Sequence, residues 1–322
     1  MNRRSPEHWL KPNWVSVALL PLSAMFFVLS VFRRSLYRFG ILPSRHPGVA
    51  TIVIGNIHVG GTGKSPIVML LAKALQSEGL RVGVVSRGYG ATLSVPKIID
   101  EESTAEEVGD EPLMIYRQTG CVVSVYPKRA EAADYLVSQA KVDVVIADDG
   151  LQHYALKRDF ECCVLGNVYG ANRYLLPAGP LRETYSRLNS VDWVLGGDGV
   201  RVGSVSETAI NLLTGERRAL SAFAGEDVHC IAAIANPQRF FDVVRSQLPN
   251  LTCHAYPDHA PLSAAELAAF PGPVLMTAKD AVKCEGFADE RMWVVEQRVT
   301  VDDQWLAAVV AKIKQKVKQY EF

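Results

Sequence analysis

The chain has 322 residues, which at about 150 residues per domain predicts two domains, each long enough to bury a core. Its 34 basic and 34 acidic residues cancel, which excludes the basic body of a general nucleic-acid binder and the acidic bias of a disordered chain. The hydrophobic fraction of 48% is high and indicates apolar surface beyond what the cores need. We therefore expect no nucleic-acid partner, and we predict no protein partner.

The first fifty residues are basic and apolar. They carry seven basic residues and one acidic residue, so the rest of the chain has an acidic excess of the same size. Residues 14–32 contain no charge and as a helix would be about 28 Å long, close to the thickness of a bilayer core. A basic, apolar segment of this kind, at 1–40, predicts contact with an anionic membrane surface.

Three arrangements of this segment stay open. A helix lying in the membrane interface fits the basic flanks, Trp9, Trp14 and the serines that recur every seven residues at 16, 23 and 30. A full span fits the length, although Pro21 interrupts it, and a helix buried against the protein has the same composition. A cleaved signal peptide is disfavoured because the apolar run is long and no small-residue cleavage motif follows it.

A glycine-rich loop follows the β-branched run at 49–57, which predicts a buried strand. After the loop, Pro66 opens an Ala- and Leu-rich helix that ends near Gly79. Strand, glycine loop, Lys-Ser and helix in this order are the context of a P-loop, whose backbone N–H groups bind phosphate. The residues expected to contact the nucleotide are His58, Val59, Gly60, Gly61, Thr62, Gly63, Lys64 and Ser65.

Two residues of this loop have specific expected roles. Lys64 reaches the β- and γ-phosphates, and the Ser65 hydroxyl ligates Mg²⁺. The strict P-loop pattern has glycine where this chain has His58, and a chance glycine-rich turn before a helix is the alternative interpretation. The strand, the Lys-Ser pair and the helix together favour the P-loop.

A second buried strand, at 142–147, ends in Asp148, Asp149 and Gly150. An acidic residue at the carboxyl end of a parallel strand beside a P-loop is where a direct or water-mediated Mg²⁺ ligand lies. Taken alone, the three residues favour an ordinary strand-to-turn sequence. Next to the P-loop, they favour the metal.

Strand-like runs alternate with helical stretches and predict a doubly wound, mostly parallel α/β sheet with the P-loop at the carboxyl edge of its strands. The runs lie at 49–57, 81–86, 121–126, 142–147, 161–165 and 191–196. This alternation ends around the glycine-rich residues Gly196, Gly197, Asp198 and Gly199, where we expect a linker to begin. We expect an N-terminal membrane-associated helical segment at 1–40, a nucleotide-binding domain at 41–202, linker strands at 203–222 and a smaller α/β domain at 223–322 that closes over the site.

The second unit begins with a strand at 228–235, followed by a helix from Asn236-Pro237 to about Leu248. Residues 263–266 form a capping box, strands follow at 274–277 and 292–295, and the last segment predicts an amphipathic helix. The six cysteines show no C-x-x-C spacing, which favours buried thiols in a reducing compartment over a disulfide framework or a zinc site.

Six motifs run in one order along the chain: GNIHVGGTGKSP (55–66), SRGYG (86–90), VGDEP (108–112), ADDGLQH (147–153), PAGPLRE (177–183) and YPDH (256–259). Over nearly its whole length the chain resembles the tetraacyldisaccharide 4′-kinases, the lipid A 4′-kinase family. The resemblance implies transfer of the γ-phosphate of ATP, with Mg²⁺, to the 4′-hydroxyl of an acylated glucosamine disaccharide 1-phosphate. It implies that lipid IV-A is formed at the cytoplasmic face of the inner membrane.

The resemblance also implies roles at matching positions. Asp110 matches the catalytic aspartate of the family and His259 its dyad partner, with Lys64 as the P-loop lysine. Ser65 stands where threonine is more usual and keeps the hydroxyl. The residues implied at the metal are Ser65, Asp148, Asp149 and Glu183.

The residues themselves leave several of these roles open. A carboxylate at position 110 accepts the proton of an attacking hydroxyl, and an imidazole at 259 orients that carboxylate or shares the proton. Asp110 is equally a helix N-cap, His259 equally a structural histidine and Glu183 equally a solvated acid. A dyad of residues 110 and 259 would join the two domains, so that closure assembles the site and excludes water.

Arginine forks suit phosphate on the nucleotide or on the acceptor, or they are solvated or ion-paired. The candidates near the motifs are Arg87, Arg117, Arg129 and Arg182.

Two other functions remain as alternatives. A membrane-associated P-loop ATPase that acts as a switch or targeting protein needs a lysine where this chain has Val59. A soluble P-loop ligase does not need the basic, apolar N-terminal segment. Guanine specificity is not predicted, because Thr277, Ala278, Lys279 and Asp280 carry the relevant residue types in the wrong order.

Overall fold

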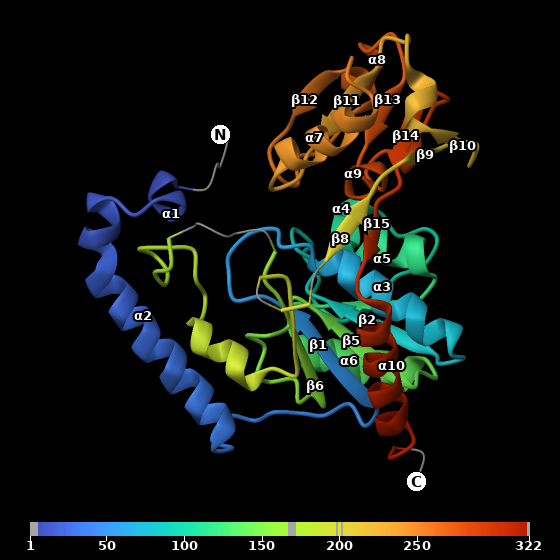
Figure 1. Cartoon of the computed structure of the whole chain (residues 1–322). Coiled ribbons are helices and arrows are strands. Elements are labelled where there is room, and N and C mark those ends of the chain that lie inside the picture. Colours follow the sequence, from blue (N-terminus) through green and yellow to red (C-terminus); the bar gives the residue numbers. More distant parts are fainter. Residues whose placement is uncertain (1–5, 167–171, 198, 201, 321–322) are drawn as a thin grey trace.

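The computed structural model describes residues 6–166, 172–197, 199–200 and 202–320, so Arg3, Arg4 and Asp198 lie outside it. Two α/β domains are joined by a narrow two-stranded ribbon, and a long N-terminal helix lies along one side of the first domain (Figure 1).

The first domain is built on a seven-stranded sheet of order β3-β4-β2-β5-β1-β6-β7. All neighbours are parallel except the edge pair β3–β4. The six expected strands are therefore present, and the two-residue edge strand β3 is an addition. The strands are β1 Ala50–Gly55, β2 Val82–Ser86, β3 Lys97–Ile98, β4 Val122–Val125, β5 Val144–Asp148, β6 Phe160–Val164 and β7 Trp193–Leu195.

Helices cover both faces of this sheet because its buried strands alternate their side chains between two apolar cores. Ile52 and Ile54 belong to one core, with α3, α5 and α10, whereas Val53 belongs to the other, with α6. The expected doubly wound class is confirmed. The helices are α3 Lys64–Ser77, α4 Ala105–Val108, α5 Asp110–Thr119, α6 Arg129–Gln139, η1 Tyr185–Ser190 and α10 Asp303–Val317.

The second domain has a six-stranded sheet of order β10-β9-β14-β13-β11-β12, parallel from β14 to β12 and antiparallel at β9 and β10. Its strands are β9 Thr208–Asn211, β10 Arg217–Ala219, β11 His229–Ala232, β12 Thr252–Ala255, β13 Val274–Met276 and β14 Met292–Val295. Its helices are η2 Leu220–Phe223, α7 Pro237–Gln247, α8 Ala264–Ala268, α9 Ala278–Ala281 and η3 Glu285–Phe287. The caps expected at Asn236 and Ser263 are both formed.

Two expected boundaries shift. Strands β9 and β10, placed at sequence level in a linker at 203–222, belong to the second sheet, and the linker is the ribbon of β8 (Gly203–Val205) and β15 (Arg298–Thr300). Helix α10, placed in the domain at 223–322, packs on the first domain, where Val309 and Ile313 join the core beside α3 (Figure 1). The chain thus enters the second domain through β8 and returns through β15.

The N-terminal segment forms α1 (Glu7–Leu10) and the long helix α2 (Trp14–Arg38), which contains Pro21. Helix α2 is long and apolar enough to cross a membrane, with a mean hydropathy of 2.3 over its most apolar window. Its only buried residues are Ser16 and Ser23, and large apolar side chains on its outer face are exposed. Burial of this helix within the protein, one of the three arrangements left open, is therefore wrong.

Candidate active site

The P-loop connects the central strand β1 to helix α3. Gly63 caps the helix with φ 82°, and Gly60 has φ 105°, so both adopt backbone conformations that side chains disfavour. An added Cβ at either glycine would meet nothing within 4 Å, so there is open space beside both glycines of the loop. Lys64 and Ser65 form the first turn of α3, where the helix N-terminus favours an anion.

Hydrogen bonds hold the loop in this shape. The Asn56 amide donates to the Thr62 hydroxyl at 2.9 Å, and the Val59 N–H donates to the Pro180 carbonyl at 2.8 Å. His58, at the position where the strict pattern has glycine, is buried, and its Nε2 lies 3.2 Å from the Tyr185 hydroxyl. This histidine packs beneath the loop as part of its support, and burial lowers its pKa.

The acidic pair lies at the carboxyl end of β5, next to β1. Asp148 is buried, and its Oδ1 is a buried oxygen with no hydrogen-bond partner. Burial and then the charge of Glu111 raise the pKa of Asp148 to about 7. A desolvated carboxylate oxygen with no donor is suited to a cation, and Mg²⁺ needs only one or two carboxylates when phosphates and waters complete its shell. Asp148 and the Ser65 hydroxyl therefore fit the expected metal.

Asp149 is held in a different way. Its backbone has φ 47°, and its carboxylate lies 3.5 Å from Lys64 Nζ and 3.2 Å from Arg182. Burial alone would raise the pKa of Asp149, but Lys64 and Arg182 outweigh it and hold the pKa below its usual range. Asp149 is thus a partnered carboxylate that orients the P-loop lysine.

Glu183 is engaged by other side chains. Its oxygens accept from Gln152 at 2.8 Å and from Tyr154 at 2.9 Å, and Arg187 lies 3.2 Å away. Gln152 also contacts Arg182, which links Glu183 indirectly to Asp149. Within the described part of the chain, no group of three or more His, Cys, Asp or Glu side chains could hold a metal. The structure therefore does not bring Glu183 into a preformed metal set, and its metal role stays a prediction.

Asp110 begins helix α5 and is buried. The preceding Gly109 has φ 91°, and an added Cβ there would lie 3.1 Å from the Tyr89 carbonyl, so the SRGYG and VGDEP motifs meet at this turn. Asp110 Oδ1 accepts from the backbone N–H of Glu111 at 2.9 Å. The N-cap of α5 is Gly109, and no side-chain cap bond is formed, so the interpretation of Asp110 as the N-cap is wrong.

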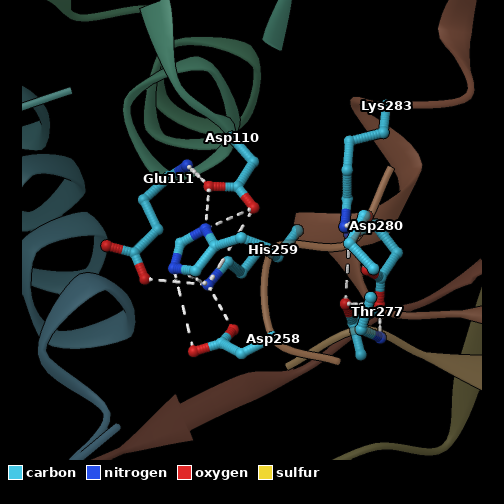
Figure 2. Close-up of polar contacts among 10 residues, drawn as sticks. Asp110, Glu111, Asp258, His259, Thr277, Asp280 and Lys283 are labelled. Carbon is cyan, nitrogen blue, oxygen red and sulfur yellow. Dashed lines mark hydrogen bonds and ion pairs between the residues drawn. The ribbon is translucent and has the colours of Figure 1, made fainter. Parts of the chain in front are cut away.

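The second domain delivers His259 to this carboxylate. His259 Nδ1 lies 2.9 Å from Oδ1 and 3.0 Å from Oδ2 of Asp110, across the junction between the domains (Figure 2). The ring of Tyr89 packs on the imidazole with centroids 4.7 Å apart, and His259 has φ 60°, an uncommon backbone conformation that often marks a functional site. The structure thus brings together the two residues that were expected to form a dyad.

Lys279, on α9, was not predicted as a site residue. Its ammonium lies 3.2 Å from His259 Nε2, 3.2 Å from Glu111, 3.1 Å from Asp258 and 3.9 Å from Asp110. Burial by itself would lower the pKa of Lys279, but the surrounding carboxylates outweigh it and raise the pKa, so the side chain is a cation. The only sequence signal was the Thr-Ala-Lys-Asp tetrapeptide, whose Thr277 caps α9.

The Asp110–His259 pair and the P-loop belong to one junction. The His259 N–H donates to the Ala233 carbonyl at 3.2 Å, and two residues further along the chain Ala235 reaches the loop, where a Cβ on Gly61 would lie 3.5 Å from it. The charge of Glu111, beside Asp110, also acts on Asp148. The segment that follows β11 is therefore bonded to the histidine and lies close to the nucleotide loop.

The four candidate arginines have different environments in the structure. Arg129 is buried and donates to the Asp148 carbonyl at 3.0 Å, and Arg182 pairs with Asp149, so both support the acidic pair. Arg117 pairs with Glu285 at 3.1 Å across the domain junction. Arg87 is exposed beside the SRGYG turn.

A model of the tetraacyldisaccharide-1-P 4′-kinase family matches residues 15–315 of the chain. The chain belongs to this family. A tetraacyldisaccharide 4′-kinase of Actinobacillus succinogenes is 41% identical over 97% of this chain and 98% of its own length. That of Pasteurella multocida is 42% identical over 95% and 97%, respectively.

A solved structure shares the fold of this kinase. It is an LpxK from Aquifex aeolicus in complex with ATP, with a TM-score of 0.79, 25% sequence identity and coverage of 92% of this chain and 99% of that one. The family expected from the six motifs, the kinase class and the P-loop α/β fold are confirmed. The individual site residues and the metal ligands stay predictions.

Proposed function

We propose that the junction between the P-loop and the Asp110–His259 pair carries the activity of the family, the ATP-dependent phosphorylation of the 4′-hydroxyl of a tetraacyldisaccharide 1-phosphate to give lipid IV-A. The observation that carries this site assignment is the contact of His259 with Asp110 across the domains, next to an open P-loop. A switch ATPase does not need a carboxylate and an imidazole aligned beside its phosphate loop.

The mechanism follows from the residues. The P-loop amides and Lys64 hold the β- and γ-phosphates, and Asp149 holds the Lys64 ammonium in place. Mg²⁺, held by Ser65 and Asp148, would neutralise developing charge on the phosphates when bound. Asp110 accepts the proton of the 4′-hydroxyl as that oxygen attacks, and His259 orients the carboxylate.

Transfer of label tests this assignment. The purified kinase is given γ-labelled ATP, Mg²⁺ and detergent-dispersed tetraacyldisaccharide 1-phosphate, and the organic phase is counted. We expect lipid-bound label with the native protein and a loss of about 10³-fold or more with Lys64→Ala. Lys73→Ala, an exposed lysine of the same helix, is the matched control and keeps the native rate. Label released only as free phosphate would favour the switch.

We further propose that α2 lies in the interface of the inner membrane on its cytoplasmic face. Polar contacts run along the helix: Ser16 accepts from Asn172, Ser23 donates to the Leu175 carbonyl at 2.8 Å, and Arg34 reaches Ser190 at 3.4 Å. A helix seated on the protein along its length offers only its outer face to lipid. That face is apolar and exposed, with basic residues at its carboxyl end.

Vesicle flotation tests this arrangement. Val28→Glu and Phe32→Glu together place two charges on the exposed face of α2, whereas Leu213→Glu places one on an exposed apolar side chain of the second domain. We expect the double variant to lose its binding to vesicles that contain anionic lipid, whereas the control should remain bound. Equal flotation of the two variants would refute the interfacial helix.

A further inference from the structure

Lys279 is the buried charged group at the domain junction that the mechanism above leaves unused. Its side chain is 12% exposed, and it is surrounded by one imidazole and three carboxylates. Glu111 and Asp110 come from α5 in the first domain, and Asp258 and His259 come from the second domain. The ammonium therefore lies at the centre of the contact that assembles the dyad.

The donor and acceptor atoms that these groups carry determine which group donates in each hydrogen bond. A lysine ammonium has three donors and no acceptor, so at 3.2 Å it donates to Nε2 of His259. A neutral imidazole has one donor and one acceptor nitrogen, so a ring that accepts at Nε2 carries its proton on Nδ1. Nδ1 lies 2.9 Å from the Asp110 carboxylate, which in its ionised form is an acceptor and not a donor. All three groups are then satisfied at once.

We propose that Lys279 is a positioning residue that holds His259 neutral, in the tautomer with the proton on Nδ1, so that the imidazole orients Asp110 and does not relay its proton. This inference rests on the proposed assignment of Asp110 as the base. It decides between the two roles that an imidazole at 259 can have, orienting the carboxylate or sharing the proton. With Nε2 engaged by a cation, the ring cannot take up a second proton without losing that contact.

The same geometry identifies the reacting oxygen. Asp110 Oδ1 accepts from both the Glu111 N–H and His259 Nδ1, which uses its two lone pairs. Oδ2 shares the His259 proton at 3.0 Å, and its other neighbour is Lys279 at 3.9 Å. Oδ2 therefore has the lone pair for the 4′-hydroxyl, and the proton moves from that hydroxyl to Oδ2 as the phosphate is transferred.

The charges around His259 determine what is expected when Lys279 is replaced. Removal of the Lys279 cation leaves Asp110, Glu111 and Asp258 uncompensated, and each carboxylate favours the imidazolium. The pKa of Asp110 rises as a result, and Nε2 of His259 loses the donor that fixes the tautomer of the ring. The titratable and charged groups that face this site are Tyr89, Asp110, Glu111, Asp258, Lys279 and Lys283.

Nitrogen-15 NMR of histidine-labelled full-length kinase in detergent reports the tautomer directly, with His259→Ala to assign the signal. We expect the native ring to be neutral with the proton on Nδ1 at pH 7.5. In Lys279→Met the signals of the neutral ring with its proton on Nδ1 should give way to those of an imidazolium, while Lys279→Arg keeps a cation and should keep the native signals. A native imidazolium, a proton on Nε2 or unchanged signals in Lys279→Met would overturn the proposal.

Arg117→Gln is the matched control, because it removes an ion pair between the same two domains without touching the dyad. It should leave the nitrogen signals of His259 at their native positions. A shift as large as that of Lys279→Met would assign the effect to domain contact and overturn the role of Lys279. The NMR readout is independent of turnover, so a native protein with the expected tautomer but no phosphate transfer would refute the proposed function alone.

Discussion

Because folding raises the pKa of the buried Asp148 carboxyl, we predict that this group lowers the free energy of unfolding as the pH rises. Its pKa is raised from 3.8 to about 7, with burial as the largest cause. A group whose pKa is raised by folding gives its full stability below the unfolded value, and that stability is lost as the pH rises through the folded value. At pH 8, with no metal bound, the ionised Asp148 therefore opposes folding. A shift of about three units corresponds to about 4 kcal/mol at 1.36 kcal/mol per unit.

Asp148→Asn tests this because the amide imitates the neutral acid in shape. At pH 8 and without Mg²⁺ or nucleotide, we expect the free energy of unfolding to rise by about 2–4 kcal/mol, since some of the gain is offset by the amide protons. At pH 4, where the folded protein holds the neutral acid, the gain should be absent and only the cost of the amide protons should remain. Kinase activity should nevertheless fall by about 10²-fold or more, because an amide holds Mg²⁺ weakly. Denaturant unfolding at both pH values and the organic-phase assay measure these effects.

Asp149→Asn is the control of opposite sign. The pKa of Asp149 is held below its usual range by Lys64 and Arg182, so its stabilisation is complete above the unfolded value near 4 and is lost below it. Asp149→Asn should therefore destabilise the protein at pH 8. If Asp148→Asn were also destabilising at pH 8, the reasoning from the unpartnered Oδ1 would be refuted.

Three further predictions follow from the contacts. Asp110→Asn should lower kcat by about 10²–10⁴-fold with little change in the melting temperature, whereas the half-exposed neighbour change Glu111→Gln should lower it far less; comparable losses in the two variants would remove Asp110 from the role of base. Gly109→Ala should lower the free energy of unfolding by about 1–3 kcal/mol in thermal unfolding, because φ is 91° there and the new Cβ would lie 3.1 Å from the Tyr89 carbonyl. Gly79→Ala should cost less, because φ is also positive there but the space around the new Cβ is open. Ser23→Val leaves the Ala178 N–H and the Leu175 carbonyl unsatisfied at a cost of about 1–3 kcal/mol, which should appear as faster amide exchange at 175–178. Ser30→Val changes a half-buried serine of the same helix stripe and should leave that exchange unchanged.

The parts of the fold that the sequence predicted are those with a local cause. The first-domain strands are continuous apolar runs because both faces of the sheet are covered, and Gly79, Asn236 and Ser263 mark helix ends through their own backbone or side-chain hydrogen bonds. Strand β12, Thr252–Ala255, has no such run because it is a partly exposed edge, and it was not predicted. The apolar face of α10 was predicted, but not its partner, since the same stripe fits either domain.

The site divides in the same way. The P-loop and the acidic pair were found from spacing, because one strand-loop-helix unit carries each group of residues. Asp110 and His259 depended on a family resemblance, since they are 149 residues apart and neither has a distinctive local pattern. Lys279 had no signal beyond the Thr-Ala-Lys-Asp tetrapeptide, which does not indicate its role. Its role exists only when α9 of the second domain meets α5 of the first, and no local pattern encodes that contact.

The segment 172–182 connects the apolar helix α2 to the nucleotide loop. Ser23 of α2 bonds to its residues 175 and 178, and four residues later the Arg182 N–H donates to the Ile57 carbonyl at 2.7 Å, while the Pro180 carbonyl accepts from Val59. Arg182 also holds Asp149, which holds Lys64. The P-loop is thus bonded to the segment that seats α2, and Ala235 of the domain that carries His259 lies close to Gly61 of the loop. A continuous set of hydrogen bonds therefore links α2 to the loop that is proposed to bind phosphate, which fixes the position of that loop relative to α2.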